Sequence, residues 1–318
     1  MANVIDAFFQ TLVSEMTEAT QVLAPTHHAV ESIYWDYNPQ EMGGIYKTLN
    51  VALPADPTNQ VVDAGSGDPP LSDISFATVP IVMNKHAYFG YPVRDFEQFL
   101  SPVVIRNVFV NAAMTGIHNH IGADVTTLFN TTNFTTNSAI SASSGGITTT
   151  QFLSGMSNLI DQKVPVQTDP DNMALLIPGT PYTKMMDGAT GTLGAAWVQA
   201  LIAGMKTAEF VRDRGMMPTT YGMTLKLDQQ MPVTGAAPNR TFTGAYMHRW
   251  AVAGVSRPLP EPDVKVVNFA RVAWNNLSLR LMVGYNQWPK LGYIVSIDAG
   301  YGLKVVRENM CQLFTVSE

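Results

Sequence analysis

The residues best suited to chemistry are two histidines in the stretch GIHNHIGAD, His118 and His120. Imidazole is the commonest side-chain ligand for metals, so a pair this close invites a metal-binding interpretation. Side chains two residues apart on a helix, however, point about 200° apart and cannot bind one ion. The sequence therefore predicts two partly solvated histidines on a helix. His27 and His28 follow Pro25, where we expect helix-dipole partners or surface residues rather than metal ligands.

Other stretches that could carry chemistry match no catalytic motif. GATGTLG at 188–194 lacks the Lys-Ser/Thr ending of a phosphate loop, and DAGSGD around Ser66 lacks the Gly-x-Ser-x-Gly frame of a hydrolase. Distant carboxylates can still meet in space, so an acid/base dyad such as Asp161 with Asp169 stays open. The run VRDRG at 211–215 fits either a solvated helix end or an intersubunit salt-bridge patch.

Composition narrows the function further. The 318 residues are 46% hydrophobic but only 14% charged, so few surface charges keep copies of the protein apart. A net charge of −6 excludes a global basic surface for DNA, and the single cysteine, Cys311, excludes a disulfide framework and is expected in the core. No apolar run of about 18 residues and no basic signal region occur, which predicts a protein kept in a cytoplasm-like compartment.

The elements that must position these residues begin with a helix. Apolar residues recur at three- and four-residue spacing from Ile5 to Leu23, after which Pro25 ends the helix. Residues 37–73 are rich in Pro, Gly, Asp and Asn and predict an extended hairpin or loop, and 79–93 predict strands. Ser101 then caps a long helix whose apolar residues, Val110, Met114, Ile117, Ile121, Val125 and Leu128, extend it over about 28 residues, roughly 40 Å.

The second part of the chain mixes helices and strands. Residues 130–150 are Ser, Thr, Asn and Gly and predict a mobile loop at a domain boundary. TTQFLSGMSNLIDQKVP predicts a capped helix, MALLIPG a buried strand, GAAWVQALIAGM a helix and YGMTLKLDQQMP a strand. A Pro-marked turn, RPLPEPD, leads to long antiparallel strands in which Leu277, Leu279, Leu281, Val283 and Tyr285 share one face. The long helix is the expected cover of that face.

This order of elements resembles the major capsid proteins of tailed bacteriophages, which share the Hong Kong ninety-seven coat fold. The resemblance covers essentially the whole chain, particularly toward the short-tailed phage branch. The segments that carry it are VPIVMNKHAYFGYPVRDFEQFLSP, NMALLIPGTPYTKMM, YGMTLKLDQQMP and LSLRLMVGYNQWPKLGYIVSIDAGYGLKVVRENMCQL. None of them is a catalytic signature, so the specificity lies in their order and spacing.

The resemblance implies an α+β fold with six parts. These are an N-terminal arm (1–45), an extended loop (46–78), a peripheral domain with the spine helix (79–130), a polar linker (131–149), an axial domain (150–262) and C-terminal strands that return to the peripheral domain (263–318). The extended loop would lie over a neighbouring subunit. Its stretch TLNVALPADPTNQVVDAGSGDPPLSD contains no lysine, which leaves only Lys47 just before that stretch, so covalent crosslinking is not expected. The lack of a long charged prodomain implies a separate scaffolding protein.

The expected function is structural. Pentamers and hexamers of the chain would form an icosahedral shell, assembled in a bacterial host cytoplasm and found in the virion, around double-stranded DNA bound without sequence specificity. Scaffolding, portal and decoration proteins are the implied partners, with no enzyme activity, cofactor, metal or membrane. An encapsulin-like compartment and a soluble hydrolase are the alternatives. Candidate intersubunit contacts are the charged residues Lys47, Asp56, Asp63, Arg94, Asp95, Glu97, Arg212, Asp213 and Arg214.

Overall fold

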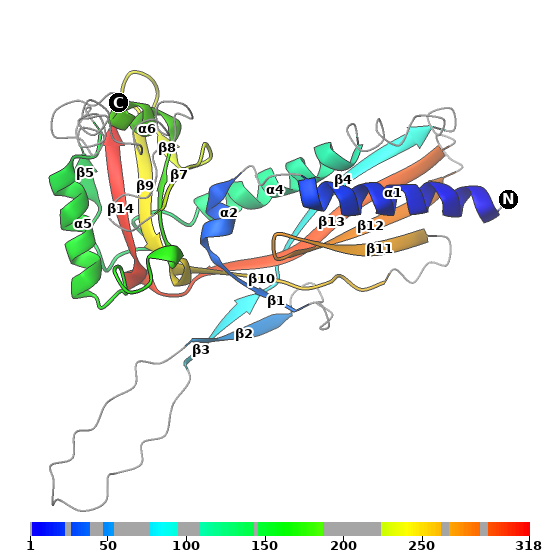
Figure 1. Ribbon diagram of the computed structural model, residues 1–318, viewed down its shortest axis with the longest axis horizontal. Coiled ribbons are helices and arrows are strands. Elements are labelled where there is room, and N and C mark those ends of the chain that lie inside the picture. Colours follow the sequence, from blue (N-terminus) through cyan, green and yellow to red (C-terminus); the bar gives the residue numbers. More distant parts are fainter. Residues whose placement is uncertain are drawn as a thin grey trace, which may run out of the picture.

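The computed structural model describes residues 2–22, 27–38, 47–53, 77–94, 109–142, 146–186, 224–261, 267–286 and 292–318. Within these ranges the chain forms an α+β fold of two halves, each built on one sheet (Figure 1). We call them the spine half, which holds the long helix α4, and the α5 half, which holds helix α5 and the C-terminus.

The sheet of the spine half contains the long strands expected from residues 277–306. Its order is β1-β10-β13-β12-β11, with β4 also paired to β13, and only the β1–β10 pair is parallel. Leu277, Leu279, Leu281 and Val283 are all buried, which confirms the predicted apolar face for these four residues. The strands are β1 (Tyr34–Tyr37), β4 (Lys85–Arg94), β10 (Val252–Ser256), β11 (Val267–Trp274), β12 (Leu277–Asn286) and β13 (Gly292–Val305).

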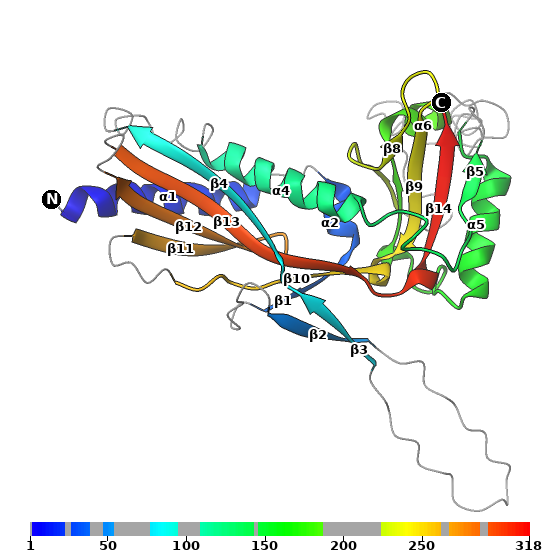
Figure 2. The same cartoon turned by 180° about the vertical axis from the view of Figure 1, so that it is seen from behind.

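Two helices, α1 (Ala2–Val22) and α4 (Asn111–Thr126), cover that apolar face (Figures 1 and 2). Each helix turns a stripe of three- and four-residue spacing to the sheet: Phe9, Leu12, Met16 and Ala19 from α1, and Met114, Ile117, Ile121 and Val125 from α4. The expectation that the long helix covers the strands is therefore confirmed. Its predicted cap at Ser101 lies outside the described residues, and the helix ends two residues before Leu128.

A short hairpin lies on the side of the spine half away from α1 and α4 (Figure 1). Strands β2 (Thr48–Leu53) and β3 (Ala77–Val82) pair in antiparallel register, as the extended hairpin predicted from the sequence requires. Its base packs on β10 through a small separate core of Leu49, Val51, Ile81, Met83, Ala253 and Val255. Residues 54–76, with the predicted strand QVVDA, lie outside the described residues.

The α5 half has a sheet of order β5-β14-β9-β6-β7, with β8 paired to β9. Helix α5 (Thr149–Asp161) packs on β14 and β5, and a capping box between Thr148 and Gln151 begins it, which confirms the predicted capped helix. The remaining elements are α2 (His28–Ser32), α6 (Gly179–Met186), β5 (Ile140–Ala142), β6 (Met173–Ile177), β7 (Thr224–Leu227), β8 (Val233–Thr234), β9 (Thr241–His248), β14 (Cys311–Ser317) and three short 3₁₀ turns, Pro170–Asn172, Arg249–Ala251 and Glu308–Met310.

The polar stretch between the halves differs from the expected mobile loop. The carboxamide of Asn130 accepts bonds from the backbone N–H groups of Thr132 and Asn133, so the polar residues build turns. Residues 140–142 then form β5, which pairs in parallel with β14. Composition did not predict these turns and this strand, because turn-forming side chains and a short edge strand produce no regular spacing of apolar residues. The predicted helix at GAAWVQALIAGM lies outside the described residues.

Candidate assembly surfaces and the joint between the halves

A buried polar cluster joins the two halves. Asp228, directly after β7, is 1% exposed, and its carboxylate accepts hydrogen bonds from the backbone N–H groups of Ala29 (2.8 Å) and Gln230 (2.9 Å). It also faces Nδ1 of His27 at 3.3 Å. An aspartate of the α5 half is therefore tied to the start of α2, which itself packs on α4. Three hydrogen-bonding groups therefore surround one buried carboxylate.

The same cluster reaches the spine helix through His27 and a glycine. Nε2 of His27 lies 2.8 Å from Oδ1 of Asn119 in α4. One turn further, a Cβ on Gly122 would lie 2.8 Å from Cγ of His27 and 2.9 Å from the side-chain oxygen of Gln230. Only glycine leaves room for this close approach. We call His27, His118, Asn119, Gly122 and Asp228 the interdomain joint.

His118 belongs to the joint and is completely buried, so the prediction of a partly solvated side chain is wrong for it and correct for exposed His120. Its ring stacks on that of His27 at 5.8 Å and lies 5.2 Å from Trp274. Burial, followed by the charge of His27, lowers the pKa of His118 to about 4. A sequence signal existed, because His118 lies four residues after Met114 and three before Ile121, within the buried stripe.

His27 is also placed differently from the expectation. It is buried and precedes α2, at the beginning of a helix instead of at a helix end. Its partners Asn119 and Asp228 are about 90 and 200 positions away in the sequence. Spacing along the chain gives no signal for such contacts. His28, beside it, is a surface residue bonded to Glu31 at 3.2 Å, as a surface assignment predicted.

Residues 257–261, part of the predicted Pro-marked turn RPLPEPD, cross the face of the spine sheet opposite the helices. Arg280 donates to the carbonyl of Pro260 at 2.6 Å, and Arg271 donates to that of Leu259 at 3.2 Å. Arg280 also donates through Nε and one terminal nitrogen to the two oxygens of Asp298, at 3.0 and 2.6 Å. Side-chain cations of two strands thus hold this segment on the sheet.

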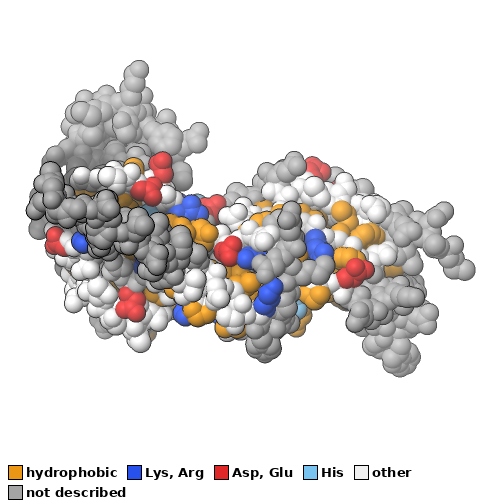
Figure 3. Space-filling model, turned by 90° about the horizontal axis from the view of Figure 1, so that it is seen from below, with side chains coloured by type: hydrophobic (Ala, Val, Ile, Leu, Met, Phe, Trp, Pro, Cys, Tyr) orange, Lys and Arg blue, Asp and Glu red, His pale blue; other side chains and the backbone are white. Residues whose placement is uncertain are grey.

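Two large apolar side chains on this face are exposed. Tyr88 is 72% exposed, and Ile294, directly opposite Pro92 in the β4–β13 register, is 44% exposed. Seen from below, hydrophobic side chains gather in patches with basic and acidic ones between them (Figure 3). Exposed apolar side chains on one sheet face are typical of a surface that meets another protein. The exposed part of this face, with Tyr88 on β4, is the candidate assembly surface.

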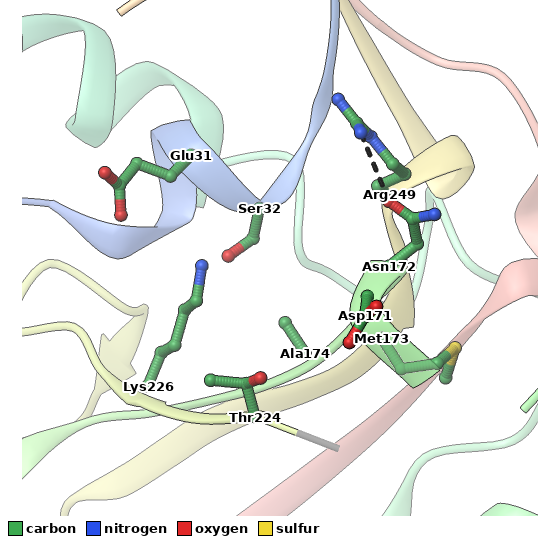
Figure 4. Close-up of a pocket in the computed structure, with 9 residues that line it drawn as sticks. All are labelled: Glu31, Ser32, Asp171, Asn172, Met173, Ala174, Thr224, Lys226 and Arg249. Carbon is green, nitrogen blue, oxygen red and sulfur yellow. Dashed lines mark hydrogen bonds between the residues drawn. The ribbon is translucent and has the colours of Figure 1, made fainter. Parts of the chain in front are cut away.

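A polar cavity of about 140 Å³ lies between α2 and the strands β6 and β7 (Figure 4). Lys226 and Arg249 bring two cations to it, and Glu31 and Asp171 bring two carboxylates. Burial lowers the pKa of Lys226, and the hydrogen bond from His28 lowers that of Glu31. The hydroxyl of Ser32 donates to the carbonyl of its own helix at 2.7 Å, so this serine is not paired with a base as a nucleophile requires.

The dyad that the sequence left open is not formed by a described contact. Asp169 accepts hydrogen bonds from Asn172 at 2.8 Å and faces His248 at 3.1 Å. Asp161 is exposed at the last residue of α5. Among the described residues, no group of three or more His, Cys, Asp or Glu side chains could hold a metal ion. No helix in the same part of the chain has the length and apolar character to cross a membrane.

The structure places few of the predicted intersubunit residues. Lys47 is exposed directly before β2, and its carbonyl accepts from the N–H of Met83 at 3.0 Å. The backbone of Arg94 ends β4 opposite Gly292. The others lie outside the described residues and stay predictions: Asp56, Asp63, Asp95, Glu97, Arg212, Asp213 and Arg214. Tyr88 was not among the predicted contact residues, although its alternation with the buried Ala87 along the strand was an available signal.

No protein-family model and no curated protein sequence matches this chain. Solved structures do. The capsid structure of the cyanophage P-SCSP1u has a TM-score of 0.57 at 9% identity, over 93% of this chain and 89% of that one. A chain of Mycobacterium phage Che8 has a TM-score of 0.52 at 12% identity, over 91% and 90%. The mature capsid of bacteriophage PhiM1 has a TM-score of 0.52 at 8% identity, over 91% and 87%.

Similarity along nearly the whole length of both chains, at about one residue in ten identical, is similarity of fold. The chain therefore has the α+β coat fold of tailed-phage capsids, the Hong Kong ninety-seven type, as its sequence predicted. The short-tailed branch and the six domain boundaries stay predictions.

Proposed function

We propose that this protein is a major capsid protein whose copies form pentamers and hexamers and close into an icosahedral shell around the double-stranded DNA of a tailed phage. The observation that carries the proposal is the coat fold, shared over 91–93% of the chain with capsid chains. A scaffolding protein, a portal protein and a decoration protein are its partners in this proposal, and it acts as a structural protein in the virion instead of an enzyme.

Features of the single chain support self-assembly. The hairpin β2–β3 is anchored at its base by a small core and by a hydrogen bond from Lys304 to the carbonyl of Pro80, and the sheet face opposite the helices exposes Tyr88 and Ile294. Extended segments and open apolar faces gain stability when neighbouring copies cover them. Many such contacts can each be weak, because closure of a shell adds them together.

Electron microscopy of the purified protein in negative stain tests the proposal. We expect closed shells or rings of five and six copies, formed by the protein alone or with its scaffolding protein. Small uniform particles under every assembly condition would contradict it. Nuclease-resistant double-stranded DNA in particles from the natural source supports the phage shell, whereas enclosed protein would support the encapsulin-like alternative.

A pair of variants at Tyr88 tests the candidate surface separately. Tyr88→Asp places a charge where a neighbouring copy would bury the ring, so we expect assembly to fail while the unfolding temperature stays unchanged. Tyr88→Phe keeps the ring and should assemble normally. Normal shells from Tyr88→Asp would remove this face from the assembly contacts without contradicting the shell itself.

A further inference from the structure

We propose that strand β4 is a two-fold contact, at which its free edge pairs in antiparallel register with β4 of a second copy of this chain. The inference rests on the proposed shell, because an icosahedral shell contains two-fold axes, at which a surface meets its own copy. It deepens that function by naming the strand, its partner and the register. Tyr88, the most exposed large apolar side chain of the described residues, lies at the centre of the contact.

One edge of β4 has no partner strand among the described residues. Residues 292–299 of β13 pair with β12 on one side and with β4 on the other, so β4 is the outermost strand there (Figures 1 and 2). Helix α4 leaves room beside this edge, since a cavity of about 420 Å³ is lined by residues 86–89 of β4 and by Gly116, Ile117 and His120 of α4. An open strand edge is a template for pairing with another chain.

A proline fixes which main-chain groups of β4 point outward. Pro92 has no N–H to donate to β13, so its nitrogen faces the free edge, where a sheet tolerates proline. Main-chain groups alternate in direction along a strand, and the N–H and C=O groups of His86, Tyr88 and Gly90 therefore point to the free edge as well. All four residues are exposed.

These outward-pointing groups select one register. When Tyr88 lies opposite Tyr88 of the second copy, His86 lies opposite Gly90, and the residues of each pair can exchange hydrogen bonds in both directions. A shift toward the carboxyl end sets Pro92 opposite a carbonyl to which it cannot donate. A shift toward the amino end leaves Gly90 beyond the start of the other strand, which begins at Lys85. The register centred on Tyr88 avoids both.

The side chains on the outer face agree with this register. A Cβ on Gly90 would meet nothing within 4 Å, and a glycine inside a strand often marks the close approach of another chain. The imidazole of His86 from the second copy would lie beside that empty space, as an aromatic ring does opposite a strand glycine. The two Tyr88 rings would lie side by side on the same face, shielding each other from water.

The charges beside the edge are compensated within each copy. Lys85 is paired with Asp124 at 2.8 Å, and Arg280 with Asp298 at 2.6 Å. A surface that faces its own copy requires this, because any uncompensated charge would meet an equal charge across the axis. The same neutrality offers nothing complementary to a strongly charged partner, so the edge is better suited to a second copy of this chain.

Paired cysteines test the contact in purified protein under assembly conditions. In the double variant His86→Cys with Gly90→Cys, each thiol lies opposite a thiol of the second copy, at about 5.5 Å between Cα atoms, which a disulfide can span. Within one chain the same two positions lie about 14 Å apart, too far for a bond. After mild oxidation we expect most of the protein to run at twice the chain mass on a denaturing gel without reductant. Cys311 is buried and does not contribute.

The two single variants are the matched controls. His86→Cys alone and Gly90→Cys alone each face a residue without a thiol, so less than about a tenth of either should form dimers. Tyr88→Cys is a second test, should the double variant fail to fold. It should form dimers as a single variant, because only the residue on the axis meets its own copy.

Two results would overturn the contact. One is a folded double variant or a folded Tyr88→Cys variant that stays monomeric after oxidation. The other is crosslinking of the single variants at positions 86 and 90 as strong as that of the double variant. Shells seen by microscopy in a variant that does not crosslink would remove this contact and leave the proposed function standing. Dimers of the double variant in a preparation without shells would support the contact and count against the shell.

Discussion

Each half of the protein contains an arginine that donates to a carboxylate through two nitrogens, but the two pairs lie in opposite environments. In the spine half, the side chains of Arg280 and Asp298 are 13% and 2% exposed. In the α5 half, those of Arg240 and Glu318 are 39% and 23% exposed, at the edge where the chain ends. The geometry is alike, so burial alone should decide how much each pair contributes to stability.

The helices of the two halves differ in how much space surrounds a glycine within each of them. Both α4 and α5 carry a glycine within the helix, where alanine is normally favoured by roughly 0.5–1 kcal/mol. A Cβ on Gly116 of α4 would meet nothing closer than Phe89, at 3.9 Å, whereas a Cβ on Gly155 of α5 would lie 2.7 Å from the ring of Phe314. Gly116 of the spine helix therefore has room for a methyl group that Gly155 of α5 lacks.

The largest effect is expected at the buried ion pair. Asp298→Ala leaves the guanidinium of Arg280 with the carbonyl of Pro260 but without its carboxylate, and removes the partner of His86 at 3.0 Å. Breaking one side of a buried pair typically destabilises a protein by about 3–5 kcal/mol. Urea unfolding should show that loss, with the spine sheet losing amide protection first.

The double replacement Arg280→Met with Asp298→Leu is the control for this prediction. Replacing both partners by apolar side chains removes the uncompensated charge, so much of the lost free energy of unfolding should return. A single Asp298→Ala variant as stable as the unmodified protein would show that burial does not distinguish the two halves.

A smaller loss is expected at Gly155. Gly155→Ala forces a methyl group against Phe314, which is itself 0% exposed and cannot move aside, and against Gln312 at 3.1 Å. Overpacking of this kind costs about 1–3 kcal/mol, more than the gain in helix propensity. Urea unfolding measures the difference.

Gly116→Ala is the matched control, the same substitution in the helix of the other half. Since its methyl group meets only ordinary contact distances, we expect up to about 1 kcal/mol of added stability. If both alanine variants changed the free energy of unfolding in the same direction, the packing difference between Gly116 and Gly155 would be contradicted.

The sequence predicted those elements in which apolar residues recur at a regular spacing. Apolar residues alternate along one strand at Leu277, Leu279, Leu281 and Val283, and the buried residues of α4 recur at helical spacing. The sheet, the helix that covers it and the fold could therefore be predicted. The capping box of α5 is likewise local. Local patterns of this kind are encoded within a few residues of one another.

What escaped prediction depends on contacts distant in sequence. Asp228 meets Ala29 some 200 residues away, and Arg280 binds a backbone carbonyl that any residue type could supply. Neither contact leaves a pattern around the residue itself. The joint, the segment held across the sheet and the exposed Tyr88 therefore needed the three-dimensional structure.

The smallest effect is expected at the exposed pair. Hydrogen bonding to Arg240 lowers the pKa of Glu318 to about 2. A lowered pKa of this kind would stabilise the fold above pH 4.5, and the contribution would be lost as the pH falls toward 2. Water and salt screen charges at such a site, so the shift should not appear as stability. Glu318→Gln and the unmodified protein should unfold at the same temperature at pH 7 and at pH 4. The opposite result would be a Glu318→Gln variant that unfolds at a clearly lower temperature than the unmodified protein at pH 7, with a difference that vanishes in high salt. It would mean that the exposed pair is energetically as important as the buried pair. Burial would then not be what separates the two halves.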